Sequence, residues 1–120
     1  MPDVRILVVD DEPGIRATVS AMLEIEGYDV AEASNGADAL VVVEATPPDV
    51  ILLDMRMPVL EGWGFAAELR ERGHRIPIVV MTAARDAAHW ASEIAATAFV
   101  AKPFGYDDLI GAVERAIPRS

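Results

Sequence analysis

Four short stretches of this chain carry side chains that could do chemistry if the fold brought them together. They are the acidic run Asp10-Asp11-Glu12, the carboxylate of Asp54, the hydroxyl of Thr82 and the ammonium of Lys102. The carboxylates would repel one another at close range, and a hard divalent cation would offset that repulsion. Oxygen ligands without His or Cys suit Mg²⁺, which often shares its coordination shell with a phosphate. A lysine and a hydroxyl beside it would stabilise a transferring phosphoryl group, and an ionised aspartate can be the nucleophile.

The single lysine strengthens this interpretation. The chain has 10 basic residues, and every one except Lys102 is an arginine. Lysine carries a compact point charge on a flexible stem, whereas arginine presents a planar fork. A lone lysine therefore suggests a position that needs the compact charge.

Apolar and amphipathic segments alternate along the chain, and they predict the elements that would position these groups. Buried strands are predicted at residues 4–9, 28–33, 49–54, 76–82 and 98–101, with the second strand the most peripheral. Helices are predicted at residues 13–26, 36–45, 62–72, 86–96 and 107–117. Five strand–helix units in sequence predict an α/β fold of the (βα)5 type, with a parallel sheet covered by helices on both faces.

The chemical groups fall at the carboxyl ends of the predicted strands, where open α/β sheets bind their ligands. Asp10 follows the first strand, and Asp54 ends the third. Thr82 ends the fourth, and Lys102 follows the fifth. One aspartate at a strand end is usually a turn or cap residue, but compatible groups at four strand ends favour a shared site.

Length and composition exclude several classes of protein. The 120 residues suit one domain, and we expect residues 1–120 to form it. Twenty acidic residues against 10 basic ones give a net charge of −10, which argues against direct binding to nucleic acid or an anionic membrane. The absence of cysteine excludes disulfides and thiolate metal sites. No signal peptide is evident, so we expect a cytoplasmic protein.

The two histidines, His74 and His89, have no partner at the spacing of metal ligands. His74 follows a glycine that should end a helix. We therefore expect His74 to be solvated.

The motifs resemble the receiver domain of the bacterial response-regulator family of two-component signalling. The matching segments are spread over the whole chain: Val8-Val9-Asp10-Asp11-Glu12, Leu53-Asp54-Met55-Arg56-Met57-Pro58 with Gly62 after it, Met81-Thr82-Ala83, and Lys102-Pro103-Phe104. The resemblance implies a doubly wound, flavodoxin-like fold with strand order 2-1-3-4-5.

The resemblance also implies roles for the site residues. Asp54 would accept the phosphoryl group, with Lys102 and Thr82 binding its oxygens after transfer. Mg²⁺ would be held by Asp54, by Asp11 directly, by Asp10 largely through water, and by the backbone carbonyl of Arg56. The Lys102–Pro103 peptide bond would be cis.

A conformational switch follows from the same resemblance. Phosphorylation would draw Thr82 toward the phosphoryl group, and Phe99 would turn into the space it leaves. The surface formed by the fourth helix, the fifth strand and the fifth helix would then change shape. Arg56 and Ala84 occupy positions that tune the phosphoryl lifetime, and Ala84 cannot orient a water molecule. We therefore expect slow self-dephosphorylation.

The implied partners are a histidine kinase or phosphotransfer protein, and an output domain or downstream protein that reads the changed surface. A homodimer formed on phosphorylation fits the same scheme. The resemblance implies a signalling protein that catalyses only its own phosphorylation and dephosphorylation. One alternative is a receiver fold used for constitutive protein interaction. Another is a Mg²⁺-dependent aspartyl-phosphate hydrolase, disfavoured because Arg56 stands where such enzymes usually carry an acid/base aspartate.

Overall fold

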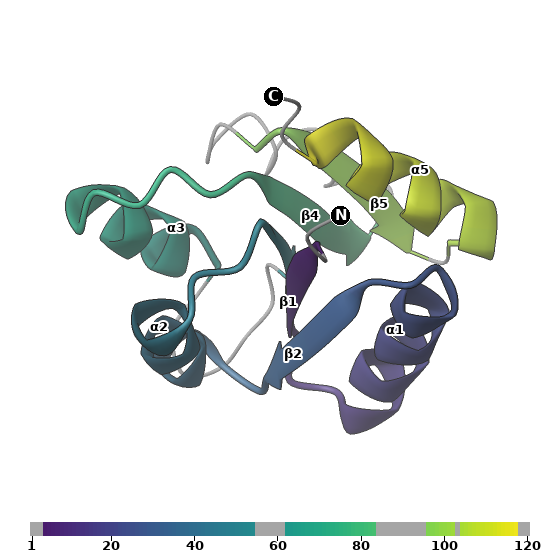
Figure 1. The fold of residues 1–120 in the computed structure, drawn as a ribbon, viewed down its shortest axis with the longest axis horizontal. Helices are drawn as coiled ribbons and strands as arrows, with labels where there is room; N and C mark the ends of the chain where they lie inside the picture. The colour runs from purple at the N-terminus through teal and green to yellow at the C-terminus, as the bar shows by residue number, and fades with distance from the viewer. Residues whose placement is uncertain (1–3, 55–61, 84–95, 103, 118–120) are drawn as a thin grey trace.

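A single five-stranded sheet organises the computed structural model, which describes residues 4–54, 62–83, 96–102 and 104–117. All neighbouring strands are parallel, in the order β2-β1-β3-β4-β5 (Figure 1). The predicted α/β fold and strand order are confirmed. The strands are β1 (Arg5–Val9), β2 (Asp29–Ala33), β3 (Val50–Asp54), β4 (Ile78–Ala83) and β5 (Ala98–Lys102).

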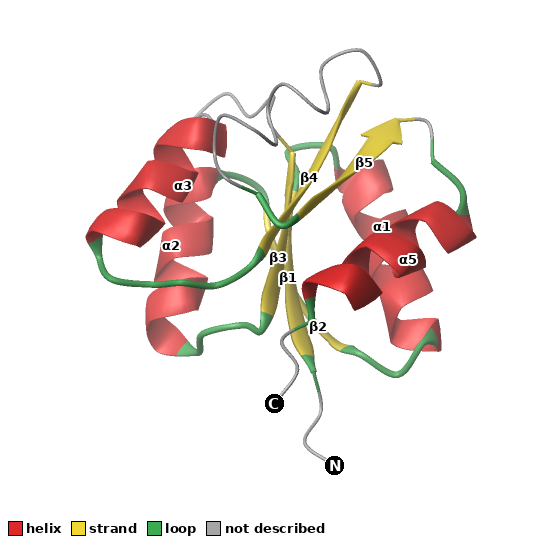
Figure 2. Ribbon diagram, turned by 90° about the horizontal axis from the view of Figure 1, so that it is seen from above, coloured by secondary structure: helices red, strands yellow, loops and turns green. Residues whose placement is uncertain are grey.

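Helices cover both faces of the sheet. The described part of the chain contains α1 (Pro13–Ile25), α2 (Gly36–Ala45), α3 (Gly62–Glu71) and α5 (Tyr106–Ala116). Helices α1 and α5 lie on one face, and α2 and α3 lie on the other (Figure 2). The fourth predicted helix, at 86–96, falls almost entirely on residues 84–95, outside the described residues.

The alternation of side chains along each strand divides the core into two clusters. In β1, Leu7 and Val9 pack on the side of α2 and α3, whereas Ile6 and Val8 pack on the side of α1 and α5. All four side chains are fully buried. A strand that is covered on both faces can be apolar at every position, which is why β1 and β3 read as continuous hydrophobic runs.

Local sequence explains where the helices begin and end. Pro13 stands at the start of α1, where the missing N–H has no helical partner to lose. Asn35 caps α2 by accepting a hydrogen bond from the amide of Asp38 at 2.8 Å. Gly27 follows α1 with φ of 93°, a conformation that favours glycine and ends the helix.

Observed and predicted bounds differ by one or two residues at several termini. Strand β4 begins at Ile78 rather than residue 76, because Pro77 has no N–H for the ladder. The carbonyl of Pro77 still accepts a hydrogen bond from the amide of Ile51, at 2.9 Å. Helix α5 begins at Tyr106, one residue earlier than predicted.

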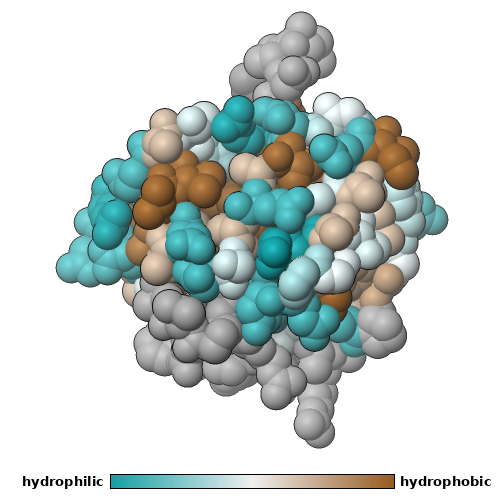
Figure 3. Space-filling model, turned by 90° about the horizontal axis from the view of Figure 1, so that it is seen from below, coloured by the Kyte–Doolittle hydropathy of each residue, from teal (hydrophilic) through white to brown (hydrophobic). Residues whose placement is uncertain are grey.

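The surface mixes polar and apolar patches. On the face that carries α1, β2 and α2, hydrophobic patches are separated by hydrophilic ones (Figure 3). Ile25 and Val41 are the most exposed large hydrophobic residues in the described part of the chain. No helix among the described residues has the length and apolar character to cross a membrane.

Candidate functional site

Asp10 lies immediately after β1, and both its amide and its Oδ1 form hydrogen bonds with neighbouring backbone groups. Its amide donates a hydrogen bond to the carbonyl of Ala33 on β2, at 3.2 Å. Its Oδ1 accepts one from the amide of Glu12, at 2.9 Å. The residue is fully buried, although the neighbouring Asp11 is exposed. The turn after β1 therefore presents one fixed carboxylate and one that reaches into solvent.

The parallel register brings the other predicted groups to the same edge of the sheet. Asp54 at the end of β3 pairs with Met81 of β4, one residue before Thr82. On the next pair of strands, Ala83 stands opposite Lys102. Each of Asp10, Asp11 and Asp54 offers a carboxylate oxygen, and these oxygens all lie within 4.8 Å of one another.

Lys102 is the positive partner of two of these carboxylates. Its Nζ lies 3.5 Å from Oδ2 of Asp10 and 3.7 Å from Oδ1 of Asp54. Both aspartates are almost completely buried, and 27% of the Lys102 side chain is exposed. Three carboxylates stand against one ammonium in this cluster, so two negative formal charges are left to be offset.

The donor set fits Mg²⁺. All three side chains offer oxygen ligands, which hard cations prefer. Oδ2 of Asp10 is buried and has no hydrogen-bond partner in the described residues, despite its longer ionic contact with Lys102. Buried carboxylate oxygens are normally hydrogen-bonded or coordinated. A cation beside Asp10 would supply the missing interaction and the missing charge.

Thr82 carries a second buried polar atom that has no hydrogen-bond partner in the described residues. Its side chain is 1% exposed, and its Oγ1 has no hydrogen-bond partner within the described parts of the chain. A hydroxyl both donates and accepts, so leaving it unsatisfied inside a protein costs free energy. It can donate a hydrogen bond to an anionic group that arrives at Asp54.

A cavity of about 950 Å³ opens at this cluster. Its polar lining includes Asp11, Asp54, Thr82 and Lys102. Its apolar lining comes mainly from α1 and the segment after β5: Ile15, Val19, Met22 and Phe104. Asp54 therefore lines a cavity whose wall is partly polar and partly apolar.

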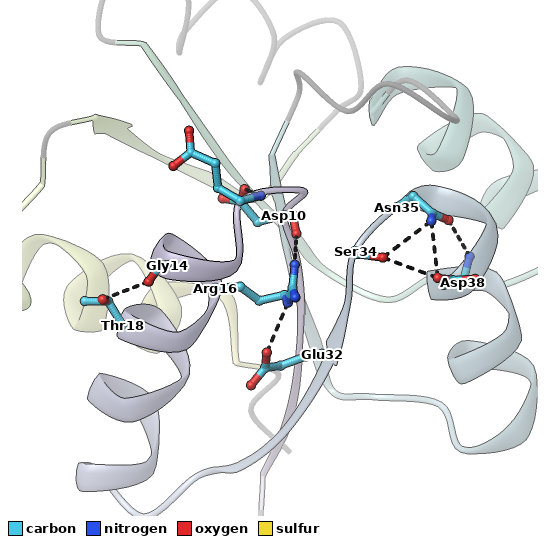
Figure 4. Close-up of polar contacts among 9 residues, drawn as sticks. Asp10, Gly14, Arg16, Thr18, Glu32, Ser34, Asn35 and Asp38 are labelled. Carbon is cyan, nitrogen blue, oxygen red and sulfur yellow. Dashed lines mark hydrogen bonds and ion pairs between the residues drawn. The ribbon is translucent and has the colours of Figure 1, made fainter.

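Sequence reasoning missed two residues that support the turn after β1. Arg16 of α1 donates a hydrogen bond from Nη1 to the carbonyl oxygen of Asp10, at 2.7 Å (Figure 4). Its Nε donates to Oε1 of Glu32 on β2, at 3.1 Å. Neither residue belongs to the motifs singled out above, and nothing in their spacing links them to Asp10.

Phe99 lies on β5, with its side chain on the surface. It is 45% exposed and borders a second cavity of about 410 Å³ together with Asp107, Asp108 and Arg115 of α5. This is an outward position from which the ring could turn. The inward turn inferred from the sequence stays a prediction.

Other sequence-based predictions fall outside the described residues. Arg56, Ala84 and Pro103 lie there, and with them the metal-binding carbonyl, the lifetime-tuning pair and the cis peptide bond. His89 also lies there.

His74 is only partly solvated, and it has a partner that the sequence did not predict. Its side chain is 22% exposed, and its Nε2 lies 2.7 Å from Oε1 of Glu44 on α2. This hydrogen bond holds the pKa of Glu44 below its usual value, with help from Arg72. The contact spans 30 residues of sequence, so only packing of α2 near the turn after α3 brings the pair together.

A tyrosine joins the start of α5 to the end of α1. The Tyr106 hydroxyl donates a hydrogen bond to Oε2 of Glu26. Ionising the phenol beside that carboxylate would sacrifice the bond and place two negative charges together. The pKa of Tyr106 is consequently raised to about 12.

Comparison with known proteins gives one consistent family. The model of the response regulator receiver domain matches residues 6–114. The chain is 40% identical to the transcriptional regulatory protein PdtaR of Mycobacterium tuberculosis over 119 residues, which cover 96% of this chain and 57% of that protein. It is 34% identical to sporulation initiation phosphotransferase F of Bacillus subtilis, over 98% of this chain and 97% of that protein. The chain spans about half the length of the curated transcriptional regulators that it matches.

Solved structures agree with this family. The chemotaxis response regulator CheY4 of Vibrio cholerae is 30% identical, with a TM-score of 0.88 over 97% of this chain and all of that one. The receiver domain of NtrX from Brucella abortus is 32% identical, with a TM-score of 0.88 over 96% of this chain and 99% of that one.

Proposed function

The chain belongs to the response regulator receiver domain family of two-component signalling, and from this premise we propose that it is a phosphorylation-dependent switch with Asp54 as its phosphoryl acceptor. The donor is a phosphohistidine of a histidine kinase or phosphotransfer protein. An oxygen of the Asp54 carboxylate attacks phosphorus, the phosphorus–nitrogen bond breaks, and the donor imidazole, protonated on its other ring nitrogen, keeps the electron pair. The products are an aspartyl phosphate and a neutral histidine on the partner.

One observation carries this proposal: the Lys102 ammonium lies within 3.7 Å of Asp54 in a cluster of three carboxylates. Lys102 would pair with an oxygen of the negatively charged phosphoryl group as that group is transferred to Asp54. The Thr82 hydroxyl, which has no hydrogen-bond partner among the described residues, would donate to another. Lys102 already contacts Asp54, whereas the Thr82 side chain would move toward the phosphoryl group after transfer.

The same cluster would hold Mg²⁺ through Asp10, Asp11 and Asp54, with the backbone carbonyl of Arg56 as a further ligand inferred from the family motif. Bound Mg²⁺ would neutralise charge on the oxygens of the transferring phosphoryl group. The apolar residues that line the same cavity as Asp54 would offer the donor protein a surface. Aromatic and aliphatic contacts there would orient the donor imidazole.

The output would be a change in the surface of β5 and α5. A Thr82 side chain drawn toward the phosphoryl group would vacate space on β4, and Phe99 would turn toward it. A downstream protein or an output domain would read the result, and a second phosphorylated copy could bind the same surface. A single receiver domain over residues 1–120 and a cytoplasmic location stay predictions from the sequence.

Intact-mass spectrometry tests the proposal directly. The protein is incubated with Mg²⁺ and acetyl phosphate beside Asp54→Asn, a substitution of nearly equal size that removes the nucleophilic oxygen. We expect the wild type alone to gain one acid-labile phosphoryl group. Beryllofluoride with Mg²⁺ provides a second readout, through the fluorescence of Trp63 and Trp90. No phosphoryl gain and no fluorescence change would favour the constitutive interaction module instead.

A further inference from the structure

We propose that Arg16 is a positioning residue of the phosphoryl-transfer site, which orients the Asp10–Asp11 peptide and thereby sets the spacing of the cation-binding carboxylates. The inference rests on the function proposed above. It concerns a residue outside the acidic, hydroxyl and lysine motifs that carry the chemistry.

The contact that carries the inference joins α1 to the turn after β1. Nη1 of Arg16 donates to the carbonyl oxygen of Asp10 at 2.7 Å, a short, charge-assisted hydrogen bond (Figure 4). The Arg16 side chain is only 19% exposed. Its amide also donates to the carbonyl of Glu12, at 2.9 Å, so the residue spans the turn by backbone and side chain.

Arg16 is the partner of the Asp10 carbonyl, and the other polar groups of Asp10 are occupied by different residues. The amide is held by Ala33 and Oδ1 by Glu12, while Oδ2 faces Lys102. The Asp10 carbonyl belongs to the peptide plane that leads into Asp11. If that plane rotated, the Asp11 carboxylate would swing away from its place within 4.8 Å of the other two. Asp11 is exposed, and no side-chain hydrogen bond restrains it within the described residues. The orientation of the preceding peptide therefore matters most for Asp11.

Glu32 gives the guanidinium its direction. Its Oε1 accepts from Nε of Arg16 at 3.1 Å, which leaves Nη1 aimed at Asp10. The Glu32 carboxylate also offsets the positive charge of Arg16. Arg16 therefore attracts the carboxylates of the site only weakly, and its main effect is to orient the Asp10–Asp11 peptide. A guanidinium can serve both acceptors in one plane, whereas a lysine ammonium lacks that fixed fork.

An electrostatic role and a geometric role for Arg16 predict different results for Arg16→Lys, which keeps the charge and loses the planar fork. If Arg16 acts through its charge, the variant should bind Mg²⁺ as the wild type does; if it acts by orienting the peptide, binding should weaken. Arg5→Lys is the matched control, because Arg5 of β1 pairs with Asp29 of β2 at 3.0 Å, near the opposite end of the same two strands. Glu32→Gln keeps an acceptor for Nε, and Glu32→Ala removes it. Thermal melts check that each variant is folded.

The measurement is a Mg²⁺ titration without phosphodonor, followed by the backbone amide signals of each variant in NMR spectra. Loss of a group that orients metal ligands typically weakens metal binding at least tenfold. We expect Arg16→Lys to raise the dissociation constant for Mg²⁺ about tenfold. Glu32→Ala should weaken binding less, and Glu32→Gln and Arg5→Lys should stay within about twofold of the wild type.

Phosphorylation by acetyl phosphate then separates positioning from loss of structure. Arg16→Lys should need about ten times more Mg²⁺ for half-maximal rate, yet reach nearly the wild-type rate at saturation. An unchanged Mg²⁺ affinity in Arg16→Lys would overturn the inference, as would equal weakening in Arg5→Lys or a wild type that binds no Mg²⁺. Tight Mg²⁺ binding without phosphorylation of Asp54 would instead refute the proposed function and leave the role of Arg16 standing.

Discussion

Replacing Lys102 with methionine should destabilise the protein in the absence of Mg²⁺ by about 2 kcal/mol. The substitution keeps most of the side-chain volume and removes the charge. It leaves Asp10 and Asp54, which are almost fully buried, without the ammonium at 3.5 and 3.7 Å. The formal charge of the four-residue cluster changes from −2 to −3.

The magnitude follows from these distances and the burial. At an effective dielectric constant of about 20, each attraction amounts to about 4–5 kcal/mol before desolvation is considered. Removing one partner of a buried ion pair costs about 3–5 kcal/mol, whereas exposed pairs contribute about 1 kcal/mol or less. Because 27% of the Lys102 side chain is exposed, the expected value lies between these limits.

Urea unfolding with and without Mg²⁺ is the assay. A loss of about 2 kcal/mol corresponds to a melting temperature lower by roughly 8 °C for a domain of this size. Saturating Mg²⁺ should recover most of the stability, because the cation offsets the same carboxylates. Arg75→Met is the matched control, since Arg75 is exposed and makes no ion pair with any described residue. A Lys102→Met protein as stable as Arg75→Met, or equally destabilised with and without Mg²⁺, would refute this electrostatic account.

Three further outcomes are expected. Thr82→Val should change the free energy of unfolding of the unphosphorylated protein by less than about 1 kcal/mol in urea, because the lost hydroxyl has no described hydrogen-bond partner, yet it should reduce the fluorescence response to beryllofluoride. Tyr106→Phe should abolish the tyrosinate absorbance transition near pH 12; because the folded pKa is raised, the stability from the Glu26 contact is present below about pH 10 and is lost as the pH rises through 12. Ala84→Glu should speed the decay of the Asp54 phosphoryl group severalfold, measured by intact mass over time, and an unchanged decay would contradict the prediction of slow self-dephosphorylation.

Much of the fold followed from local patterns. Buried strands of a parallel sheet have no polar face, so runs such as those at β1 and β3 could be identified without knowledge of their neighbours. Helix termini could be predicted nearly as well, because Pro13 and Gly27 act through their own backbone constraints. The remaining errors of one or two residues arose where a single hydrogen bond decides the boundary, as at Pro77.

The members of the candidate site were also predictable, because strand ends are positions that topology alone brings to one edge of the sheet. Asp10, Asp11, Asp54, Thr82 and Lys102 could be named from their types and their places after predicted strands. The sequence contained no information about the distances between them. The placement of Lys102 between Asp10 and Asp54 depends on the parallel register of strands β1, β3, β4 and β5.

Contacts between surface side chains of different elements required the tertiary structure. Arg16 and Glu32 lie on a helix and an edge strand, and His74 and Glu44 are 30 residues apart. No periodicity or motif connects such pairs, because their meeting depends on how whole elements pack. Residue types and the succession of strands and helices were thus determined by local patterns, whereas the strand order was predicted only through the family resemblance. The orientation of the Asp10–Asp11 peptide was decided by packing of α1 against the sheet, which brings the Arg16 guanidinium to the Asp10 carbonyl.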